Sequence, residues 1–134
     1  MDLQIKEYVC YNQEEVLALY ESVGWTGYTC RFECMERAFA QSLKIYGAYV
    51  QDKLVGLVRA VGDGVTIVYI QDLLVNPAYH RMGIGKALLG KILEEYRTVY
   101  QKVLTTDDTE KTLAFYHHMG MKVDKEIGCR VFMC

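Results

Sequence analysis

The residues most able to do chemistry lie in a short glycine-containing turn, residues 80–86, which reads HRMGIGK. Gly83 and Gly85 carry no side chain, so the backbone N–H groups of the turn can close around an anion. The turn leads into a segment of helical periodicity, and a helix N-terminus adds unpaired N–H groups and a partial positive charge. Arg81 and Lys86 add two cations nearby. The pattern predicts a phosphate-binding turn at the start of a helix.

Two nucleotide-binding motifs compete for this turn, and each lacks a residue that it requires. A dinucleotide fingerprint, G-x-G-x-x-G/A, needs a small third residue for close packing of helix and strand, but Leu88 stands there. A Walker A loop needs a first glycine and a magnesium-binding hydroxyl, where this chain has His80 and Ala87. Neither motif is therefore expected, and a turn without any ligand is the alternative for an isolated G-x-G pair.

The flanking residues matter here, because residues 72–89, DLLVNPAYHRMGIGKALL, resemble the acetyl-CoA-binding motif of the GNAT superfamily. Members of this superfamily are acetyl-CoA-dependent N-acyltransferases, and their motif reads approximately V-x-P-x-Y-[QR]-x-x-G-x-[GA]-x-x-L-L. His80 departs from the motif, since Gln or Arg is usual at its position. The residues that match in place are Val75, Pro77, Tyr79, Gly83, Gly85, Leu88 and Leu89.

A second string extends the resemblance to nearly the whole chain. Residues 114–121, AFYHHMGM, resemble the family's later F-Y-x-x-x-G-[FM] helix, although Thr109 replaces the family's Asn seven residues before the tyrosine. The resemblance implies acetyl-CoA as the acetyl donor. It also implies that the strand splays from its neighbour after residues 73–75, whose main chain pairs with the pantetheine arm. The implied contacts of acetyl-CoA are Leu73, Leu74, Val75, His80, Arg81, Met82, Gly83, Ile84, Gly85, Lys86, Thr109 and Tyr116.

Acetylation of an amine needs a proton donor for the leaving thiolate, and Tyr116 aligns with the tyrosine that the family often uses as general acid. A phenol with an ordinary pKa of about 10 is protonated at neutral pH. A backbone N–H near Leu74 or Val75 is expected to meet the oxyanion. Asp72 is the candidate general base, because a carboxylate in an otherwise apolar strand must be hydrogen-bonded, paired or functional. A buried structural carboxylate and a water chain as base are the alternatives.

The acceptor is expected to bind at the first two predicted helices and their loop, because the predicted contacts of acetyl-CoA all lie later in the chain. Glu21 could meet a cationic amine, and an aromatic wall would suit an arylalkylamine or a polyamine. Core packing is the alternative for the aromatic candidates. The substrate-binding candidates are Glu21, Trp25 and Tyr28.

The expected function is transfer of an acetyl group from acetyl-CoA to a primary amine of a small molecule, by direct attack in a ternary complex. A chain of 134 residues with no visible docking extension favours a small acceptor. A protein lysine or N-terminus as acceptor, and a non-catalytic acyl-CoA-binding module, are the two alternatives.

Hydrophobic periodicity and turn residues predict the elements that must position these groups. Asn12 is expected to cap the first helix, and Asp107 or Asp108 the last. In chain order we expect a strand at 3–11, a helix at 13–24, a loop at 25–29, a helix at 30–44, a hairpin at 45–64, a strand at 65–75, a helix at 83–96, a strand at 102–106, a helix at 109–120 and two strands in 121–134.

This order predicts a single α/β domain over residues 1–134. Its central sheet is expected to be GNAT-like, mixed and largely antiparallel, with about six or seven strands, a splay at the cofactor site and about four flanking helices. Strand 66–75, helix 83–96 and strand 102–106 should form a parallel, right-handed unit.

Composition narrows the possible partners. The net charge of −2 gives no reason to expect a nucleic acid partner. No apolar run reaches about 18 residues, so no membrane span is expected, and the N-terminus lacks a signal peptide, so we expect a cytoplasmic protein with free thiols. Cys30 and Cys34 are at most half a metal site, and no metal is expected. A homodimer that pairs through the last strand is a further expectation.

Overall fold

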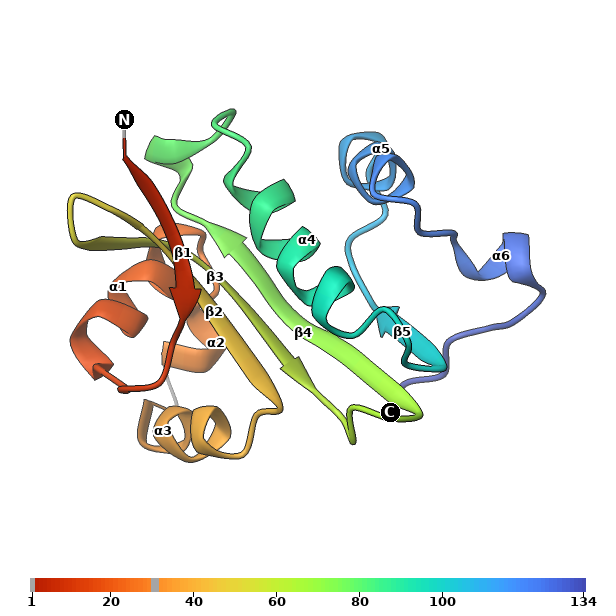
Figure 1. Cartoon of the computed structure of the whole chain (residues 1–134), viewed down its shortest axis with the longest axis horizontal. Helices are drawn as coiled ribbons and strands as arrows, with labels where there is room; N and C mark the ends of the chain where they lie inside the picture. Colours follow the sequence, from red (N-terminus) through yellow and green to blue (C-terminus); the bar gives the residue numbers. More distant parts are fainter. Residues whose placement is uncertain (1, 30–31) are drawn as a thin grey trace. The chain divides into compact units, whose positions relative to one another are not determined.

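The computed structural model describes residues 2–29 and 32–134, and the chain divides into two compact units, Met1–Leu104 and Thr105–Cys134. The single-domain interpretation stays a prediction. Figure 1 labels the strands and α-helices. The strands are β1 Leu3–Glu7, β2 Lys44–Val50, β3 Lys53–Val61, β4 Ile67–Val75 and β5 Gln101–Leu104. The helices are α1 Gln13–Ser22, α2 Thr26–Thr29, α3 Phe32–Ala40, α4 Ile84–Glu95, α5 Glu110–His118 and α6 Asp124–Ile127, and a short 3-10 turn, η1 Pro77–Tyr79, follows β4.

The first unit is built on a five-stranded sheet with the order β1-β2-β3-β4-β5. The pairs β1–β2, β2–β3 and β3–β4 are antiparallel, whereas β4–β5 is parallel, as the strand–helix–strand unit predicted. The β2–β3 hairpin turns at Gln51 and Asp52, whose φ angles are 51° and 63°. Two consecutive left-handed residues give the hairpin turn whose twist matches its strands.

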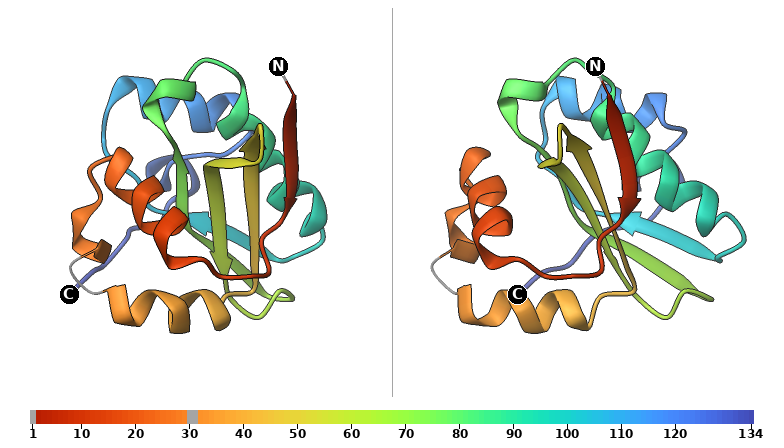
Figure 2. Two further views of the ribbon diagram at one scale, coloured as in Figure 1. Left: turned by 90° about the vertical axis from the view of Figure 1, so that its left-hand side faces the viewer. Right: turned by 60° about the vertical axis from the view of Figure 1, so that its left-hand side comes forward.

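Helices cover both faces of this sheet. Figure 2 shows α1, α2 and α3 on one face and α4 on the opposite face. The predicted apolar stripe of α4 is confirmed, since Ile84, Leu88, Leu89 and Ile92 are all buried. Between the sheet and the first three helices lies an aromatic-rich core of Tyr8, Val16, Leu19, Tyr20, Met35, Phe39, Ile45, Leu54, Leu57 and Leu74.

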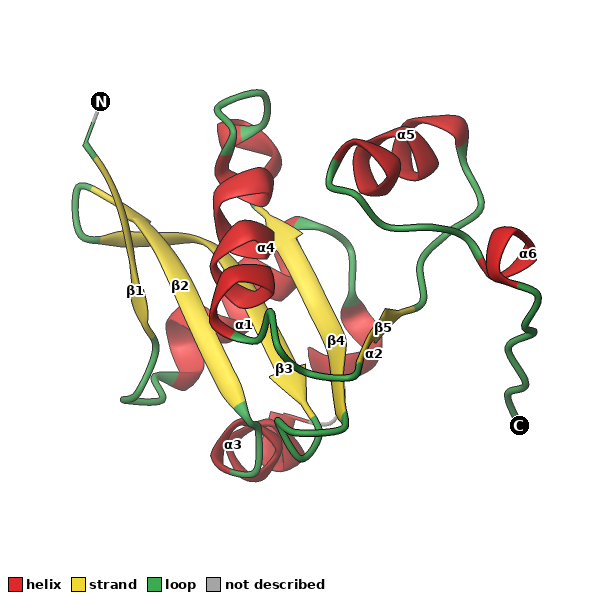
Figure 3. Cartoon of the chain, turned by 45° about the vertical axis from the view of Figure 1, so that its right-hand side comes forward, coloured by secondary structure: helices red, strands yellow, loops and turns green. Residues whose placement is uncertain are grey.

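The strands β4 and β5 part after Ile70, whereas the resemblance implied a splay after residues 73–75. β5 pairs only with residues Ile67–Ile70, the first part of β4. Residues 71–75 continue along β3 beyond the end of β5, which is drawn as a short arrow in Figure 3. One side of this part of β4 is therefore not covered by β5.

Two predicted assignments in the first unit need correction. Residues 25–29, expected as a loop, contain the short helix α2. Gly24 ends α1 with a φ of 79°, and the Trp25 N–H then donates to the Tyr20 carbonyl at 3.1 Å, which turns the chain so that a further helical turn can form. The helix predicted over 30–44 is observed as α3 only from Phe32 to Ala40, and Cys30 lies outside the described residues.

The prediction of two strands at the C-terminus is also wrong. Residues 121–134 contain the helix α6 and no strand, and Figure 3 shows only helices and loops in the second unit. The Glu126 carboxylate accepts the Val123 N–H at 3.0 Å, and Gly128 ends the turn with a φ of 72°, so local capping stabilises a helical turn here. The described sheet has five strands rather than the predicted six or seven. The homodimer stays a prediction, but the last strand through which it was expected to pair is not formed in the described residues.

The cap of α5 also differs from the prediction. The Thr109 hydroxyl, not Asp107 or Asp108, accepts the Thr112 N–H at 3.3 Å. At the first helix the predicted cap is confirmed, because Asn12 accepts the Glu15 N–H at 3.2 Å. No helix in the described ranges is both long and apolar enough to cross a membrane.

Candidate acetyl-CoA site

The glycine turn has the backbone shape that an anion site needs. Arg81 and Gly83 have φ angles of 66° and 74°, and Gly83 is the N-cap of α4 without any side-chain cap. The N–H groups of the first helical turn are therefore not taken by a capping side chain. A Cβ built on Gly83 would meet no atom within 4 Å, so the space above the turn is open.

The turn is held in place by its own residues on the strand side. The Asn76 N–H donates to the Val55 carbonyl at 2.8 Å, and the Asn76 side chain accepts the Ala78 N–H at 3.0 Å. Pro77 occupies the first turn of η1, where a missing N–H costs nothing. Lys53, from the β2–β3 hairpin, lies 5.7 Å from the centre of the Tyr79 ring. These contacts fix where the chain leaves β4.

Helix packing fixes the other side of the turn. A Cβ on Gly56 in β3 would lie 3.1 Å from side-chain atoms of both Ile84 and Leu88. The absence of a side chain at Gly56 thus lets the first turns of α4 approach the sheet closely. Ile84 is buried in this contact and can reach a ligand only through its backbone.

His80 connects the turn to the end of β4. Its ring Nε2 lies 3.0 Å from the Val75 carbonyl oxygen. Because a carbonyl oxygen only accepts, Nε2 must carry the hydrogen in this contact. The residue that departs from the resemblance therefore makes a defined hydrogen bond between the two parts of the predicted cofactor site.

Beyond its pairing with β5, β4 presents the main-chain groups of every second residue at its open edge. Antiparallel ladders turn the N–H and C=O groups of successive residues to opposite sides. Since the Asn76 N–H points to β3, the main-chain groups of Leu74 also face β3, and those of Leu73 and Val75 face away from it. Leu73 and Val75 thus offer main chain to a ligand along the edge beyond β5, while the Leu74 side chain is buried in the core.

The remaining predicted contacts in this unit surround the turn. Arg81, Met82 and Lys86 are exposed, and Gly85 lies in the first turn of α4. The exposed cations place positive charge around the backbone N–H groups. The structure therefore gathers Leu73, Val75 and residues 80–86 at one end of β4.

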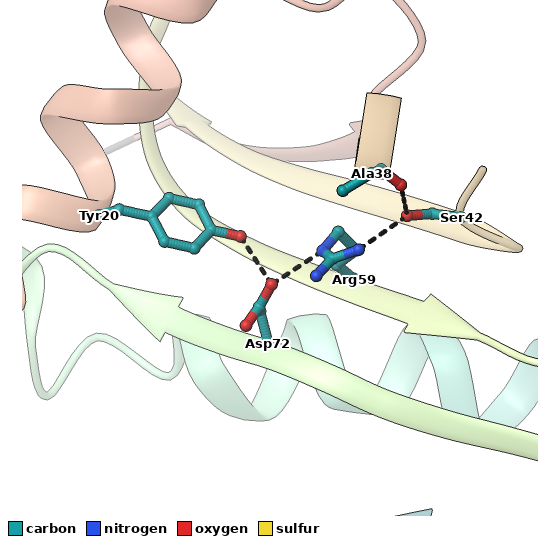
Figure 4. A network of polar contacts seen from close by, with 5 residues as sticks. All are labelled: Tyr20, Ala38, Ser42, Arg59 and Asp72. Atoms are coloured by element: carbon teal, nitrogen blue, oxygen red, sulfur yellow. Dashed lines mark hydrogen bonds and ion pairs between the residues drawn. The ribbon is translucent and has the colours of Figure 1, made fainter. Parts of the chain in front are cut away.

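Asp72 lies in a buried polar network on the face of the sheet that α1 covers, shown in Figure 4. Its Oδ2 atom accepts hydrogen bonds from Arg59 Nε at 2.8 Å and from the Tyr20 hydroxyl at 2.9 Å. Arg59 also donates to the Ser42 hydroxyl at 3.2 Å, which donates to the Ala38 carbonyl at 2.8 Å. Asp72 is 3% exposed, Arg59 6% and Tyr20 0%. Such a geometry is that of a buried paired carboxylate, and the role of Asp72 as general base stays a prediction.

Tyr116 and Thr109 belong to the second unit. Tyr116 lies on α5, half-buried, with its ring centre 5.0 Å from that of Phe115. Burial, and secondarily the negative charge of Asp107, raises the pKa of the Tyr116 phenol above its ordinary value of 10.0. Tyr116 therefore keeps its proton at neutral pH. The Thr109 hydroxyl is occupied as the cap of α5.

The acceptor candidates are Glu21 at the end of α1, Trp25 between α1 and α2, and Tyr28 in α2. Glu21 is exposed, and Trp25 is 39% exposed. The Trp25 ring stands edge-on to Tyr20, with 6.1 Å between the ring centres. Tyr28 is part of α2, and its side chain lies outside what the structure describes. Within the described residues, no group of three or more His, Cys, Asp or Glu side chains is arranged to hold a metal ion.

Comparison with known proteins decides the family. Residues 6–121 match the Acetyltransferase (GNAT) family. This chain belongs to the GNAT acetyltransferase family. A solved GNAT-family acetyltransferase from Streptococcus pneumoniae TIGR4 is 40% identical, with a TM-score of 0.90 over 99% of this chain and 97% of that chain. The fold predicted from the sequence is thereby confirmed as a GNAT fold.

Two further GNAT relatives differ in what their names record. Histone acetyltransferase TAP1 from Glycine max is 34% identical over 79 residues, which are 57% of this chain and 33% of that protein. This chain spans about one third of the length of the curated relatives that it first matches. PaiA N-acetyltransferase from Thermoplasma acidophilum, solved in complex with coenzyme A, shares the fold with a TM-score of 0.68 at 19% identity.

The sequence did not single out Arg59 or Tyr20, although both complete the buried network of this GNAT chain. A signal for Arg59 was present, since it is the one charge within the apolar run LVGLVRAV, residues 54–61. A buried arginine in such a strand needs an acidic partner, and Asp72 is the corresponding charge in β4. Tyr20 gave no such signal, because tyrosine on an apolar helix face is common in cores.

Proposed function

We propose that this chain transfers an acetyl group from acetyl-CoA to a primary amine of a small molecule by direct attack in a ternary complex. The observation that carries the proposal is the glycine turn with its open backbone at the head of α4, beside the uncovered edge of β4. A pyrophosphate supplies the negative charge and the acceptors that such a turn binds. An extended pantetheine amide chain supplies hydrogen-bonding partners for a strand edge.

Binding of the donor divides between these two features. Residues 80–86 would hold the pyrophosphate through backbone N–H groups, with Arg81 and Lys86 adding positive charge. The main chain of Leu73 and Val75 would pair with the pantetheine arm and orient the thioester. The coenzyme A complex of the PaiA enzyme, which has the same fold, supports acetyl-CoA as the donor.

The chemistry needs one bond formed, one broken and two protons moved. The neutral amine nitrogen attacks the thioester carbonyl carbon, and the C–S bond breaks as the tetrahedral intermediate collapses. We assign the proton for the leaving thiolate to Tyr116, whose raised pKa keeps it protonated. The nitrogen's proton leaves to the predicted base Asp72, whose Oδ2 accepts two hydrogen bonds in the core, or to water.

A protein acceptor is the second candidate, because one relative carries the name histone acetyltransferase. Partly exposed Trp25 and exposed Glu21, four residues apart around the end of α1, favour a small amine with an apolar or aromatic part over an extended peptide. An assay that compares a panel of small primary amines with lysine-containing peptides separates the two acceptor classes.

The decisive experiment measures thiol release from acetyl-CoA with that panel for the wild type, Tyr116→Phe and Tyr100→Phe. Tyr100 is 85% exposed and serves as the matched control. We expect Tyr116→Phe to lower kcat by roughly 10²- to 10⁴-fold, the usual contribution of a general acid. Coenzyme A affinity, measured by calorimetry, should stay nearly constant, and Tyr100→Phe should behave as wild type.

The pH profile gives an independent check of the acid. Because the pKa of Tyr116 is raised above its ordinary value of 10.0, its acid form is retained as pH increases past neutrality, and activity should be lost at a higher pH than with an unperturbed phenol. Coenzyme A binding without turnover across the whole panel would instead favour an acyl-CoA-binding module. Absence of any coenzyme A binding would overturn the proposal altogether.

A further inference from the structure

The buried network around Asp72 joins the two functional sides of the first unit. Asp72 is in β4, immediately before the main-chain edge that begins at Leu73. Tyr20, which donates to Asp72, is in α1 and contacts Trp25 on the predicted acceptor side. Asp72 is part of the strand proposed to hold the donor, and it bonds Tyr20, whose ring contacts the acceptor candidate Trp25; Figure 4 shows Tyr20 and Asp72.

The ion pair also marks a change of register in the sheet. Arg59 faces Asp72 across the β3–β4 ladder, but the next residue, Ala60, faces Ile70. Gln71 is therefore an extra residue in β4, and such a bulge bends a strand locally. β5 stops pairing at Ile70, so the Arg59–Asp72 pair holds β4 to β3 from the point at which β5 ends.

Stability alone does not explain such a pair. Burial of two charges carries a large desolvation cost, and replacing a buried ion pair by apolar residues is often neutral or stabilising. The network does restrict geometry, because Tyr20 is held by its hydroxyl at Asp72 and by ring contacts at Phe39 and Trp25, at 6.5 and 6.1 Å. The Arg59 guanidinium also lies 5.7 Å from the centre of the Phe39 ring.

We propose that Tyr20, Asp72 and Arg59 are positioning residues, which hold α1 and Trp25 at a fixed place relative to the donor edge of β4. The proposal rests on the proposed acetyl transfer for its kinetic consequence, and on the structure alone for its effect on Trp25. Loss of the Tyr20 hydroxyl should let α1 and Trp25 shift without touching the glycine turn. The effect should therefore appear in acceptor binding and not in coenzyme A binding.

Tyr20→Phe is the test, and Tyr8→Phe is its matched control. Tyr8 is also buried, its hydroxyl also donates to a carboxylate, that of Glu15 at 2.8 Å, and its ring also meets Phe39, at 5.9 Å. Both variants remove one buried hydroxyl from the same aromatic core. The Tyr8 hydroxyl also accepts the Asn12 N–H at 3.0 Å and so holds the start of α1, whereas the Tyr20 hydroxyl joins α1 to β4 close to Trp25.

Two readouts separate positioning from simple stability. The chain has one tryptophan, so acrylamide quenching of its fluorescence reports on Trp25 without any need for activity. We expect Tyr20→Phe to increase this quenching and to raise KM for the best amine of the panel about tenfold, the size expected for one buried hydrogen bond. Coenzyme A affinity should stay within twofold, and Tyr8→Phe should change neither readout, whatever its effect on melting temperature.

The outcomes distinguish this inference from the proposed function. Increased quenching in Tyr20→Phe but not in Tyr8→Phe supports positioning, even if no variant and no wild-type protein acetylates an amine. Equal behaviour of the two variants, or unchanged quenching in Tyr20→Phe, overturns it. Asp72→Asn adds a second check, because positioning predicts a raised KM that is not additive with Tyr20→Phe, whereas a general base predicts a loss of kcat.

Discussion

At the scale of single residues, His80 shows how a departure from a family motif can be accommodated. The motif usually carries Gln or Arg there, and His80 uses its ring Nε2 to bind the Val75 carbonyl at 3.0 Å. A carbonyl oxygen has two lone pairs, so this bond leaves Val75 able to accept from a ligand as well. His80 thus ties the turn to β4 without closing the edge.

The variants His80→Gln and His80→Ala test this tie. Gln can still donate to the Val75 carbonyl, so its coenzyme A affinity should match wild type. Ala cannot, and the loss of about 0.5–1.5 kcal/mol predicts a dissociation constant raised roughly 2-fold to 13-fold in calorimetry. His118→Ala, an exposed change on α5, is the control. Tighter binding by His80→Ala would mean that the imidazole competes with the donor for Val75.

At the scale of elements, the start of α4 depends on a backbone conformation that few residues adopt. Gly83 has a φ of 74°, in the left-handed region, and no atom lies within 4 Å of its missing Cβ. The constraint on this position is therefore backbone strain and not crowding. Gly90, inside the same helix, is equally uncrowded but has no such φ.

Two alanine substitutions in α4 should consequently have opposite effects. Gly83→Ala should lower the free energy of unfolding by about 1–2 kcal/mol and weaken coenzyme A binding, because the turn must distort. Gly90→Ala should raise the free energy of unfolding by about 0.5–1 kcal/mol, because alanine is the better helix former. Urea unfolding and calorimetry measure both. A stabilising Gly83→Ala would show that the turn does not require its left-handed residue.

At the scale of the whole molecule, the residues predicted to contact the cofactor are divided between the two compact units. The glycine turn belongs to residues 1–104, and Tyr116 to residues 105–134. A ligand that contacts a segment slows its hydrogen exchange by stabilising the closed state. Exchange measured with and without coenzyme A therefore reports on each unit separately.

We expect coenzyme A to slow exchange at residues 80–86 and also at residues 109–116, because the GNAT resemblance implies contacts at Thr109 and Tyr116. Residues 3–7 in β1, at the far edge of the sheet, should be unaffected and serve as the internal control. Protection confined to the first unit would remove Thr109 and Tyr116 from the cofactor contacts. The acid would then have to be sought among residues 1–104.

The sequence by itself determined the parts of this protein that depend on local chemistry. Each of these parts acts within a few residues, where the spacing along the chain fixes the geometry. They are Asn12 at the start of α1, the hairpin turn, Pro77 after β4 and the glycine turn before α4. The same locality explains why the motif at residues 72–89 was sufficient to predict the family.

Only the tertiary structure decided the features made by residues distant in sequence. Tyr20 and Asp72 are 52 residues apart, and Arg59 and Asp72 are 13 apart, so no periodicity or turn signal could pair them. The last residues show the converse, since the β-prone string RVFMC, residues 130–134, forms no strand in the described structure. Strand formation needs a partner along the edge, and that partner is supplied by the fold and not by propensity.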